Sequence, residues 1–333
     1  MKRLFCFISL MLLSALLLDA QIPAKVESFR ADDVKLTPSA FKHAEEMDLQ
    51  YLLGINPDRL LAPYLKEAGL APKAENYTNW ENTGLDGHIG GHYLSALAYM
   101  YAATGNHEIK GRLDYYISEL KRCAEANGNG YLSGVSNGKQ IWKEISEGNI
   151  RAASFGLNDR WVPLYNIHKI YAGLRDAYLV TGNKDAKKMF IDLTEWMYNL
   201  TSGLTDEQLQ DMLRSEHGGL NEVFADAADI SGDSRFMDLA KRFSHMAVLE
   251  PLLKGEDRLT GMHANTQIPK VIGYKRIADL EGNEDWNKAA EFFWKTVVEN
   301  RSITIGGNSV REHFHPADDF SSMLESEQGP ETC

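Results

Sequence analysis

The chain has 333 residues, 44% of them hydrophobic, which is enough to bury the core of one large domain or two ordinary ones. Its formal net charge of −12 argues against a nucleic-acid-binding protein, because phosphates are bound by clustered lysines and arginines. Three cysteines are too few for a disulfide framework, and a neutral or cationic small substrate suits this charge better than a polyanion.

Residues 1–20 have the pattern of a secretory signal. Two basic residues precede an apolar run over 4–18, small and polar residues follow, and cleavage is expected after Ala20. The run is short for a membrane span, and no cysteine follows it where a lipid anchor would be attached. We therefore expect an exported protein, periplasmic or extracellular, with no stable membrane anchor.

Two cysteines remain once this signal is removed. Cys6 leaves with the signal, and the mature chain keeps Cys123 and Cys333. A single disulfide between them is one alternative, although two isolated cysteines seldom lie within bridging distance.

From residue 21 onward the chain repeats a helix, a glycine-centred turn and a second helix. The first helix of each pair has apolar and small residues at three- and four-residue spacing, and these helices are expected at 92–106, 167–183, 220–233 and 267–283. Each ends at Gly-Asn or Gly-Asp, a typical helix stop, and the last three of these glycines are 50 residues apart. More highly charged second helices follow, and the stretches 41–53 and 59–68 predict one earlier pair.

Helical hairpins at a fixed period indicate a solenoid or a closed α/α toroid. The first helices, rich in Ala and Gly, fit an inner layer, and the charged second helices fit an outer one. We predict an all-α fold over residues 21–333, an (α/α)6 barrel that is incomplete in this chain. Apolar helix faces beside the last hairpin should then be exposed. The best β signal is one short strand at 301–307.

Polar residues cluster at the start of each expected inner helix. If these helices run parallel, their starts meet at one end of the toroid, where unpaired backbone N–H groups also point. The candidates are Asp86, His88, His92, Trp161, Asn166, His168, Glu216, His217, Asn221, Glu222, His263, Asn265 and Gln267. Any one of them is more often a core or capping residue. Their recurrence in four hairpins favours a site rich in hydrogen bonds, suited to the hydroxyls of a sugar.

The terminal segment contains Glu312 and ends in GPETC. Glu312 is a candidate general acid for glycoside cleavage, although on its own it would more often be a surface carboxylate paired with a base. His313 and His315 could join it in a metal cluster. Glu331 and Cys333 are donors of the type that zinc binds, but a zinc site needs at least three protein ligands. Alone, this pair is more simply a capping glutamate near an inert cysteine.

Five blocks occur in order along the chain: GLDGHIGGH, LYNIHKIYAGLRDAYLVTGN, MHANTQIPK, TIGGNSVREHF and GPETC. Together, from about residue 30 to the end, they resemble the cysteine glycosidases typified by β-L-arabinofuranosidases, glycoside hydrolase families 127 and 146. The resemblance implies an (α/α)6-barrel catalytic domain followed by β-sandwich domains. It also implies release of terminal β-L-arabinofuranose with retention, so that an arabinose-containing plant oligosaccharide or polysaccharide is the expected partner.

The resemblance further implies that Glu312 is the general acid/base and that Glu331 and Cys333 are the first two ligands of a zinc ion. In the family a later pair of cysteines completes the zinc site and includes the nucleophile, and that pair has no counterpart here. We therefore expect the sequence to be the N-terminal part of a longer reading frame. On that expectation the 333-residue chain alone is inactive and retains no stoichiometric zinc.

Substrate-binding roles follow from the same resemblance. His168 and His263 match histidines that hold the arabinose hydroxyls, and Glu222 lies where a pocket carboxylate is expected. His88 and His92 belong to a characteristic block, but the resemblance gives neither an individual role.

Two other functions stay open. A carboxylate-only α/α-barrel glycosidase or lyase could pair Glu312 with Asp86 or Glu222, and its hydrolysis would not depend on zinc. A non-catalytic helical-repeat protein could bind glycans or another protein, and its function would be unchanged by Glu312→Gln.

Overall fold

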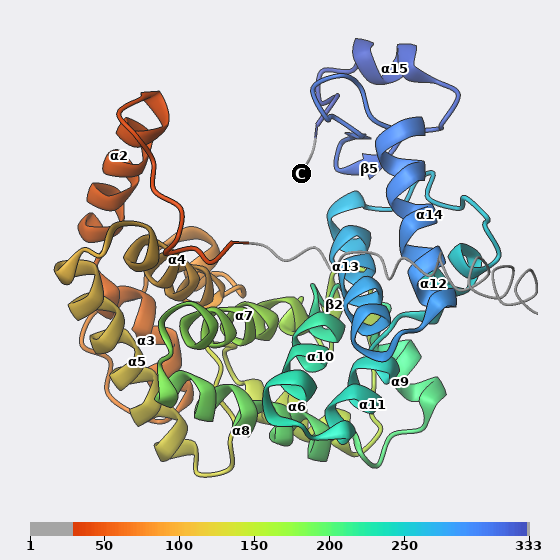
Figure 1. The fold of residues 1–333 in the computed structure, drawn as a ribbon. Coiled ribbons are helices and arrows are strands. Elements are labelled where there is room, and N and C mark those ends of the chain that lie inside the picture. Colours follow the sequence, from red (N-terminus) through yellow and green to blue (C-terminus); the bar gives the residue numbers. More distant parts are fainter. Residues whose placement is uncertain (1–28, 332–333) are drawn as a thin grey trace, which may run out of the picture.

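The computed structural model describes residues 29–331, so the signal predicted at 1–20 and Cys333 lie outside the described residues. Helical hairpins follow one another around an arc, from α2 and α3 at one end to α13 and α14 at the other (Figure 1). The hairpins are α4 (His88–Thr104) with α5 (His107–Asn127), α7 (Pro163–Thr181) with α8 (Lys184–Thr201), α10 (Leu220–Ser231) with α11 (Ser234–Arg242), and α13 (Ala264–Glu281) with α14 (Glu284–Asn300). The earlier pair predicted at 41–53 and 59–68 forms the helices α2 (Ala40–Gly54) and α3 (Pro57–Glu67), but these pack on α4 and α5 rather than on each other. The prediction of an all-α fold built from helical pairs is confirmed. In the described part of the chain, no helix has the length and apolar character needed to cross a membrane.

Short elements occupy the connections between these helices. They are η1 (Asn79–Asn82), α6 (Gly138–Ser146), β1 (Ala152–Ala153), β2 (Gly156–Leu157), β3 (Arg160–Trp161), α9 (Asp206–Met212), α12 (Met246–Leu253), β4 (Ser309–Val310), β5 (His313–Phe314) and α15 (Phe320–Glu325). The strands β1, β2 and β3 form a small antiparallel sheet, and β4 pairs with β5 as a hairpin.

The strand predicted at 301–307 is wrong. The N–H of Ile303 donates to the carbonyl of Gly307 (2.9 Å), and the N–H of Gly306 donates back to the carbonyl of Ile303 (2.8 Å). Gly306 has a left-handed φ of 94°, which closes this turn. The β-branched residues of RSITIGG therefore form a turn, and the strands begin only at Ser309.

The inner helices α4, α7, α10 and α13 run parallel, which is the condition for their starts to meet at one end. Asn166 of α7 donates to the carbonyl of Asp86, just before α4 (2.8 Å). Asn221 of α10 donates to the carbonyl of Lys270 in α13 (2.9 Å), a residue 49 positions later and close to the period of the sequence repeat. Residues at matching positions of successive repeats are thus neighbours, and the helix starts gather at one end of the arc.

The same turn joins each inner helix to its outer partner. A glycine in the left-handed conformation ends the inner helix, and the side chain of the next residue caps the outer helix by accepting from its first N–H groups. The glycines are Gly105, Gly182, Gly232 and Gly282, and the caps are Asn106, Asn183, Asp233 and Asn283.

The close approach of α4 to α7 depends on Gly91. A Cβ atom at this position would lie 2.2 Å from the carbonyl oxygen of Lys169, so Gly91→Ala must push the two helices apart. We expect this variant to lower the free energy of unfolding by about 1–3 kcal/mol, measured by urea denaturation. Gly111→Ala is the matched control, because nothing lies within 4 Å of a Cβ there, and it should be neutral or stabilising. Equal stability of the two variants would contradict this packing role.

An apolar groove lies on the outside of the last hairpin, between α13 and α14. It has a volume of about 640 Å³, and its lining includes the exposed side chains of Ile272, Trp294 and Val298. This is the exposed apolar patch that the sequence predicts beside the last hairpin. Far from it, Cys123 is a free cysteine buried in α5.

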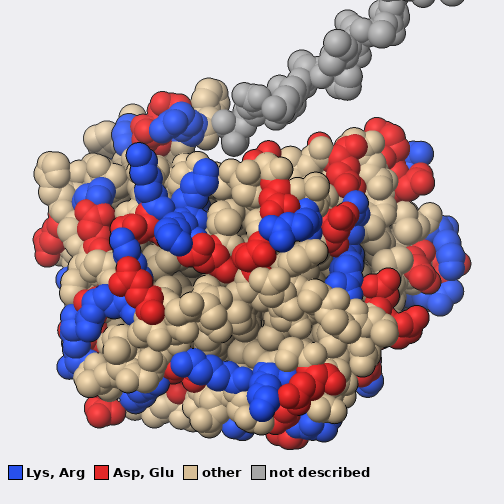
Figure 2. Space-filling model, turned by 90° about the horizontal axis from the view of Figure 1, so that it is seen from below, with Lys and Arg blue, Asp and Glu red and all other residues tan. Residues whose placement is uncertain are grey.

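Charged residues of both signs are interspersed on the face shown in Figure 2, where they flank a band of uncharged side chains. Charged side chains of the described residues pair along or between outer helices, for example Lys188 with Asp192 (2.6 Å) and Arg235 with Glu195 (2.8 Å). Exposed pairs of this kind contribute little to stability.

Candidate active site

Glu312 occupies the tip of the β4–β5 hairpin. Val310 pairs with His313, so that Arg311 and Glu312 form a two-residue loop, and both have left-handed φ angles of 49° and 66°. Such loops match the twist of a hairpin but usually use Asn or Gly. For other residues the conformation costs on the order of 1–3 kcal/mol and persists only where the surroundings hold it. Strained backbone of this kind is common at functional sites.

Two predicted site residues hold Glu312 in place. Its carbonyl accepts from the N–H of Ala264 at the start of α13 (2.8 Å), and its own N–H donates to the carboxylate of Glu331. Its Oε2 lies 3.3 Å from Nε2 of His263. The structure therefore brings His263, Glu312 and Glu331 together, although they come from separate segments. The Glu312 side chain is 54% exposed, so that a ligand can reach it.

The ring of His263 is fixed by its position as the N-cap of α13. Its Nδ1 accepts from the backbone N–H of Thr266 (3.2 Å), which leaves the ring proton on Nε2, where it can be donated to Glu312. Phe155 and His313 pack edge-on against the same ring, with centroids 5.1 and 5.2 Å away. His263 is thus held in one orientation with its proton directed at the candidate acid.

A cavity of about 260 Å³ opens beside His263. Its volume is slightly below that of most ligand sites, which span about 300–1,000 Å³, and this suits a single small sugar. Polar and aromatic side chains line it, among them Phe155, His245, His263, Thr266, Gln267, Lys270 and His313.

Lys270 is a member of this cavity that the sequence reasoning missed. Its side chain is almost fully buried and donates to Oε1 of Gln267 and to Nδ1 of His245, both at 3.0 Å. Burial lowers the pKa of Lys270 to about 7, and the nearby Glu216 opposes this shift. Burial has the opposite effect on a carboxyl group and raises the pKa of Glu216, while the charges of His263, Lys169 and Lys270 act to lower it. The only available signal was a lysine placed one helical turn after Gln267 in MHANTQIPK.

The buried amine predicts a pH-dependent stability. The pKa of Lys270 is about 7 in the folded chain and 10.5 in the unfolded chain. Between these two pH values the unfolded chain therefore holds a proton that the folded chain has lost. The free energy of unfolding should therefore rise with pH, by at most about 1.4 kcal/mol per pH unit. Lys270→Met should remove this rise when urea unfolding is followed across the window. Lys188→Met, at an exposed position on α8, should leave the slope unchanged, and identical slopes in both variants would contradict the assignment.

His168 and His92 lie on the inner wall. The ring of His168 packs against the backbone of Gly218 and Gly219, where a Cβ would lie within 2.6 and 3.1 Å of its nitrogens. Burial, with the charge of Lys169, holds the pKa of His168 well below 6.5, so the ring is neutral and can both donate and accept. His92 is partly exposed, but the surrounding protein removes much of the water around its ring. This desolvation, together with the charge of Lys169, lowers the pKa of His92 to about 4.

Glu222 is engaged by a salt bridge. Its Oε1 lies 2.9 Å from Nη1 of Arg175, which also contacts Asp226 at 2.8 Å. Burial raises the pKa of Glu222, and the Arg175 guanidinium opposes this. The structure places Glu222 on the inner wall, held by an arginine.

His88 has a structural environment. It is buried, and its Nδ1 lies 2.7 Å from Oε1 of Glu81 and 2.8 Å from the carbonyl of Leu85. The same Glu81 carboxylate accepts from the N–H groups of Gly87 and Ile89, at 3.0 Å each, at the start of α4. His88 therefore helps to fix the helix start, and direct contact with a substrate stays a prediction.

A family model described as the β-L-arabinofuranosidase, GH127 catalytic domain matches residues 33–333. The chain belongs to this family. Among solved structures, a GH127 β-L-arabinofuranosidase from Geobacillus stearothermophilus is similar with a TM-score of 0.56 and 13% identity, over 84% of this chain and 47% of the other. A second structure, a GH127 β-arabinofuranosidase, gives a TM-score of 0.59 and 15% identity, over 86% and 46%. A comparison with curated proteins finds no match.

At these identities the solved structures show the fold of the GH127 chain and no more. The chain spans about half the length of both relatives. The family match confirms the resemblance carried by the five sequence blocks, and it agrees with the arc of helical hairpins in Figure 1.

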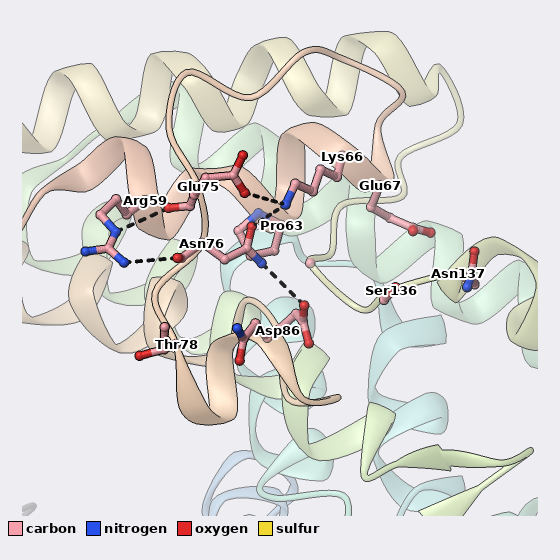
Figure 3. Close-up of a pocket in the computed structure, with 12 residues that line it drawn as sticks. Arg59, Pro63, Lys66, Glu67, Glu75, Asn76, Thr78, Asp86, Ser136 and Asn137 are labelled. Carbon is pink, nitrogen blue, oxygen red and sulfur yellow. Dashed lines mark hydrogen bonds and ion pairs between the residues drawn. The ribbon is translucent and has the colours of Figure 1, made fainter.

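In this GH127 chain Asp86 lines a different cavity, of about 610 Å³, between α3 and the loop at 134–137 (Figure 3). Its Oδ2 accepts from the N–H of Gly84 (3.0 Å), and its Oδ1 accepts from Asn76 (3.3 Å), which in turn accepts from Lys66 (2.7 Å). These polar groups engage one another and brace the loop before α4. They give no support to a pairing of Asp86 with Glu312.

Within residues 29–331, no group of three or more His, Cys, Asp or Glu side chains is arranged to hold a metal ion. The alternative cluster of Glu312, His313 and His315 is not formed. His313 is exposed beside His263, whereas His315 is buried with its ring 5.0 Å from that of Phe320. Of the two ligands implied for zinc, Glu331 lies next to Glu312, and Cys333 is outside the described residues.

Proposed function

We propose that the whole protein is a retaining glycoside hydrolase that releases terminal β-L-arabinofuranose from plant glycans. The observation that supports this most strongly is the position of Glu312, at a strained hairpin tip in contact with His263. A general acid must reach the glycosidic oxygen and stay oriented, and a half-exposed carboxyl held through its own backbone meets both needs.

In this proposal Glu312 donates a proton to the departing oxygen and later accepts one from water. The Nε2–H of His263 orients the carboxyl group. Neutral His168 and the exposed His92 bind sugar hydroxyls, and Phe155 covers one side of the cavity. Each of these residues acts at the end of the arc where the inner helices begin.

Zinc is the proposed cofactor. Glu331 and Cys333 would hold it together with further ligands, and the donor set fits, because carboxylate and thiolate are both zinc donors and Glu331 lies beside the candidate acid. When bound, the ion would keep a cysteine in its thiolate form at neutral pH. We also propose export through the signal at 1–20, which the N-terminal residue of the mature protein would test.

The test uses the whole gene product and an aryl β-L-arabinofuranoside. We expect hydrolysis with retention, followed by NMR of the released sugar, and loss of activity with a chelator that added zinc reverses. Inversion would contradict the proposed chemistry, and hydrolysis that resists chelation would favour the carboxylate-only enzyme. Glycan binding without hydrolysis would favour the non-catalytic repeat protein.

A further inference from the structure

Three large aromatic side chains are exposed at the same end of the molecule. Phe155 is 43% exposed, Trp161 39% and Trp80 61%. Aromatic side chains usually bury most of their surface, so three neighbouring exposed rings call for an explanation. We call Phe155, Trp161 and Trp80 the aromatic strip.

The small sheet β1–β3 links the members of the strip. Phe155 lies in the turn between β1 and β2, and the residue after it, Gly156, pairs directly with Trp161 in β3. The carbonyl of Ser154 accepts from the N–H of Glu216 (3.0 Å), which ties the tip of the sheet to the loop before α10. The sheet thus crosses from the start of α7 to the start of α10.

Ring contacts connect the strip to the candidate site at one end and to α4 at the other. Phe155 packs against His263 with a centroid distance of 5.1 Å. Trp161 packs edge-on against Trp80 at 6.4 Å, and Trp80 lies 6.3 Å from the ring of His88. Phe155 therefore lies beside the contact between His263 and Glu312, and Trp161 and Trp80 form a second contact next to the start of α4.

The backbone around Trp161 is strained. Val162, directly after Trp161, has a φ of 37°, whereas Asn158 and Asp159 of the β2–β3 loop adopt a left-handed conformation that such residues favour. A β-branched residue with positive φ is a genuine outlier. The surrounding structure holds Trp161 in a backbone conformation that the chain would not adopt freely, and such positions often serve a function.

We propose that the aromatic strip binds the sugar units on the leaving-group side of the bond that is cleaved, in an arabinose-containing oligosaccharide. This inference rests on the proposed function. An enzyme that releases a terminal sugar has the rest of the glycan on the leaving-group side, and Phe155, one member of the strip, packs against the histidine that contacts the candidate acid. Exposed ring faces stack against the C–H faces of uncharged sugars and carry no charge of their own.

The test measures binding by isothermal titration calorimetry on the whole gene product, with methyl β-L-arabinofuranoside and with a β-linked L-arabinofuranose disaccharide. The protein called wild type below and every variant also carry Glu312→Gln, so that neither sugar is hydrolysed during the titration. The wild type should bind the disaccharide more tightly. Trp161→Ala and Trp80→Ala should each weaken disaccharide binding about three- to tenfold and leave the methyl glycoside unchanged. Trp161→Phe, which keeps a ring, should recover part of the loss.

Trp294→Ala is the matched control, because Trp294 is an exposed tryptophan on α14 and lines the separate apolar groove. It should bind both sugars as the wild type does, and thermal melting should show that every variant is folded. The proposed role of the aromatic strip would be overturned if the wild type bound the two sugars with equal affinity, or if the tryptophan variants bound both sugars more weakly to the same extent. Either result would leave the proposed function standing. Failure of the wild type to bind either sugar would overturn both.

Discussion

Glu312→Gln in the whole gene product should lower kcat for an aryl β-L-arabinofuranoside with a poor leaving group by about 10²- to 10⁴-fold. Glutamine has almost the same size, and its carbonyl can still accept the Nε2–H of His263, but it cannot deliver a proton. The loss should shrink with a strongly activated leaving group, because such a group departs without protonation. Initial rates with both substrates measure the difference.

The control is Glu325→Gln, an exposed carboxylate on α15 in the same terminal segment. It should leave both rates unchanged. If Glu312→Gln kept more than a tenth of the wild-type rate with the poor leaving group, Glu312 would not be the acid. A loss of the same size with both substrates would point to a structural role.

Arg301→Met should lower the free energy of unfolding by about 2–4 kcal/mol, because several charge-assisted hydrogen bonds are lost and the buried carbonyl of His315 is left without its donor. The Arg301 guanidinium is almost fully buried and binds both oxygens of Asp257, at 2.8 and 2.9 Å. It also donates to Thr260 Oγ1 (3.0 Å) and to the carbonyl of His315. Because His315 directly follows β5, the variant should also loosen the hairpin that carries Glu312.

Urea denaturation measures this effect, with Arg258→Met as control. Arg258 forms an exposed pair with Glu256, and such pairs contribute about 0–1 kcal/mol. A similar midpoint for the two variants would show that Arg301 does not anchor the terminal segment. Retention of full activity in a destabilised Arg301→Met protein would separate its role in stability from any role in the site.

The fold was accessible from the sequence because its signals are local and repeated. Apolar spacing marked the inner helices, and the turns at Gly182, Gly232 and Gly282 fixed a period that the structure reproduces as contacts between neighbours. The β4–β5 hairpin was not accessible, because Arg311 and Glu312 adopt a left-handed turn without the Asn-Gly signal that usually announces it. The β-branched residues within 301–307 led to a strand prediction there, whereas the strands begin at Ser309.

The candidate site was predicted only in part, for a related reason. His88 and His92 are one helical turn apart on α4, yet His88 is buried against Glu81 and His92 is exposed. Sequence spacing gives their shared face but not the loop that covers one of them. Lys270 resembled an ordinary surface lysine of a helix, and its burial depends on His245, which belongs to a different segment.

The carboxyl group of Glu312 owes its location to main-chain bonds on both sides, one to Ala264 and one to the Glu331 side chain. Exchange of the other side chains of the hairpin leaves both bonds intact, provided that Glu331 is kept. A residue added to or removed from 309–314 would instead change the pairing of the hairpin and turn the carboxyl group towards its opposite face. Divergence within this stretch is therefore constrained in length more tightly than in composition.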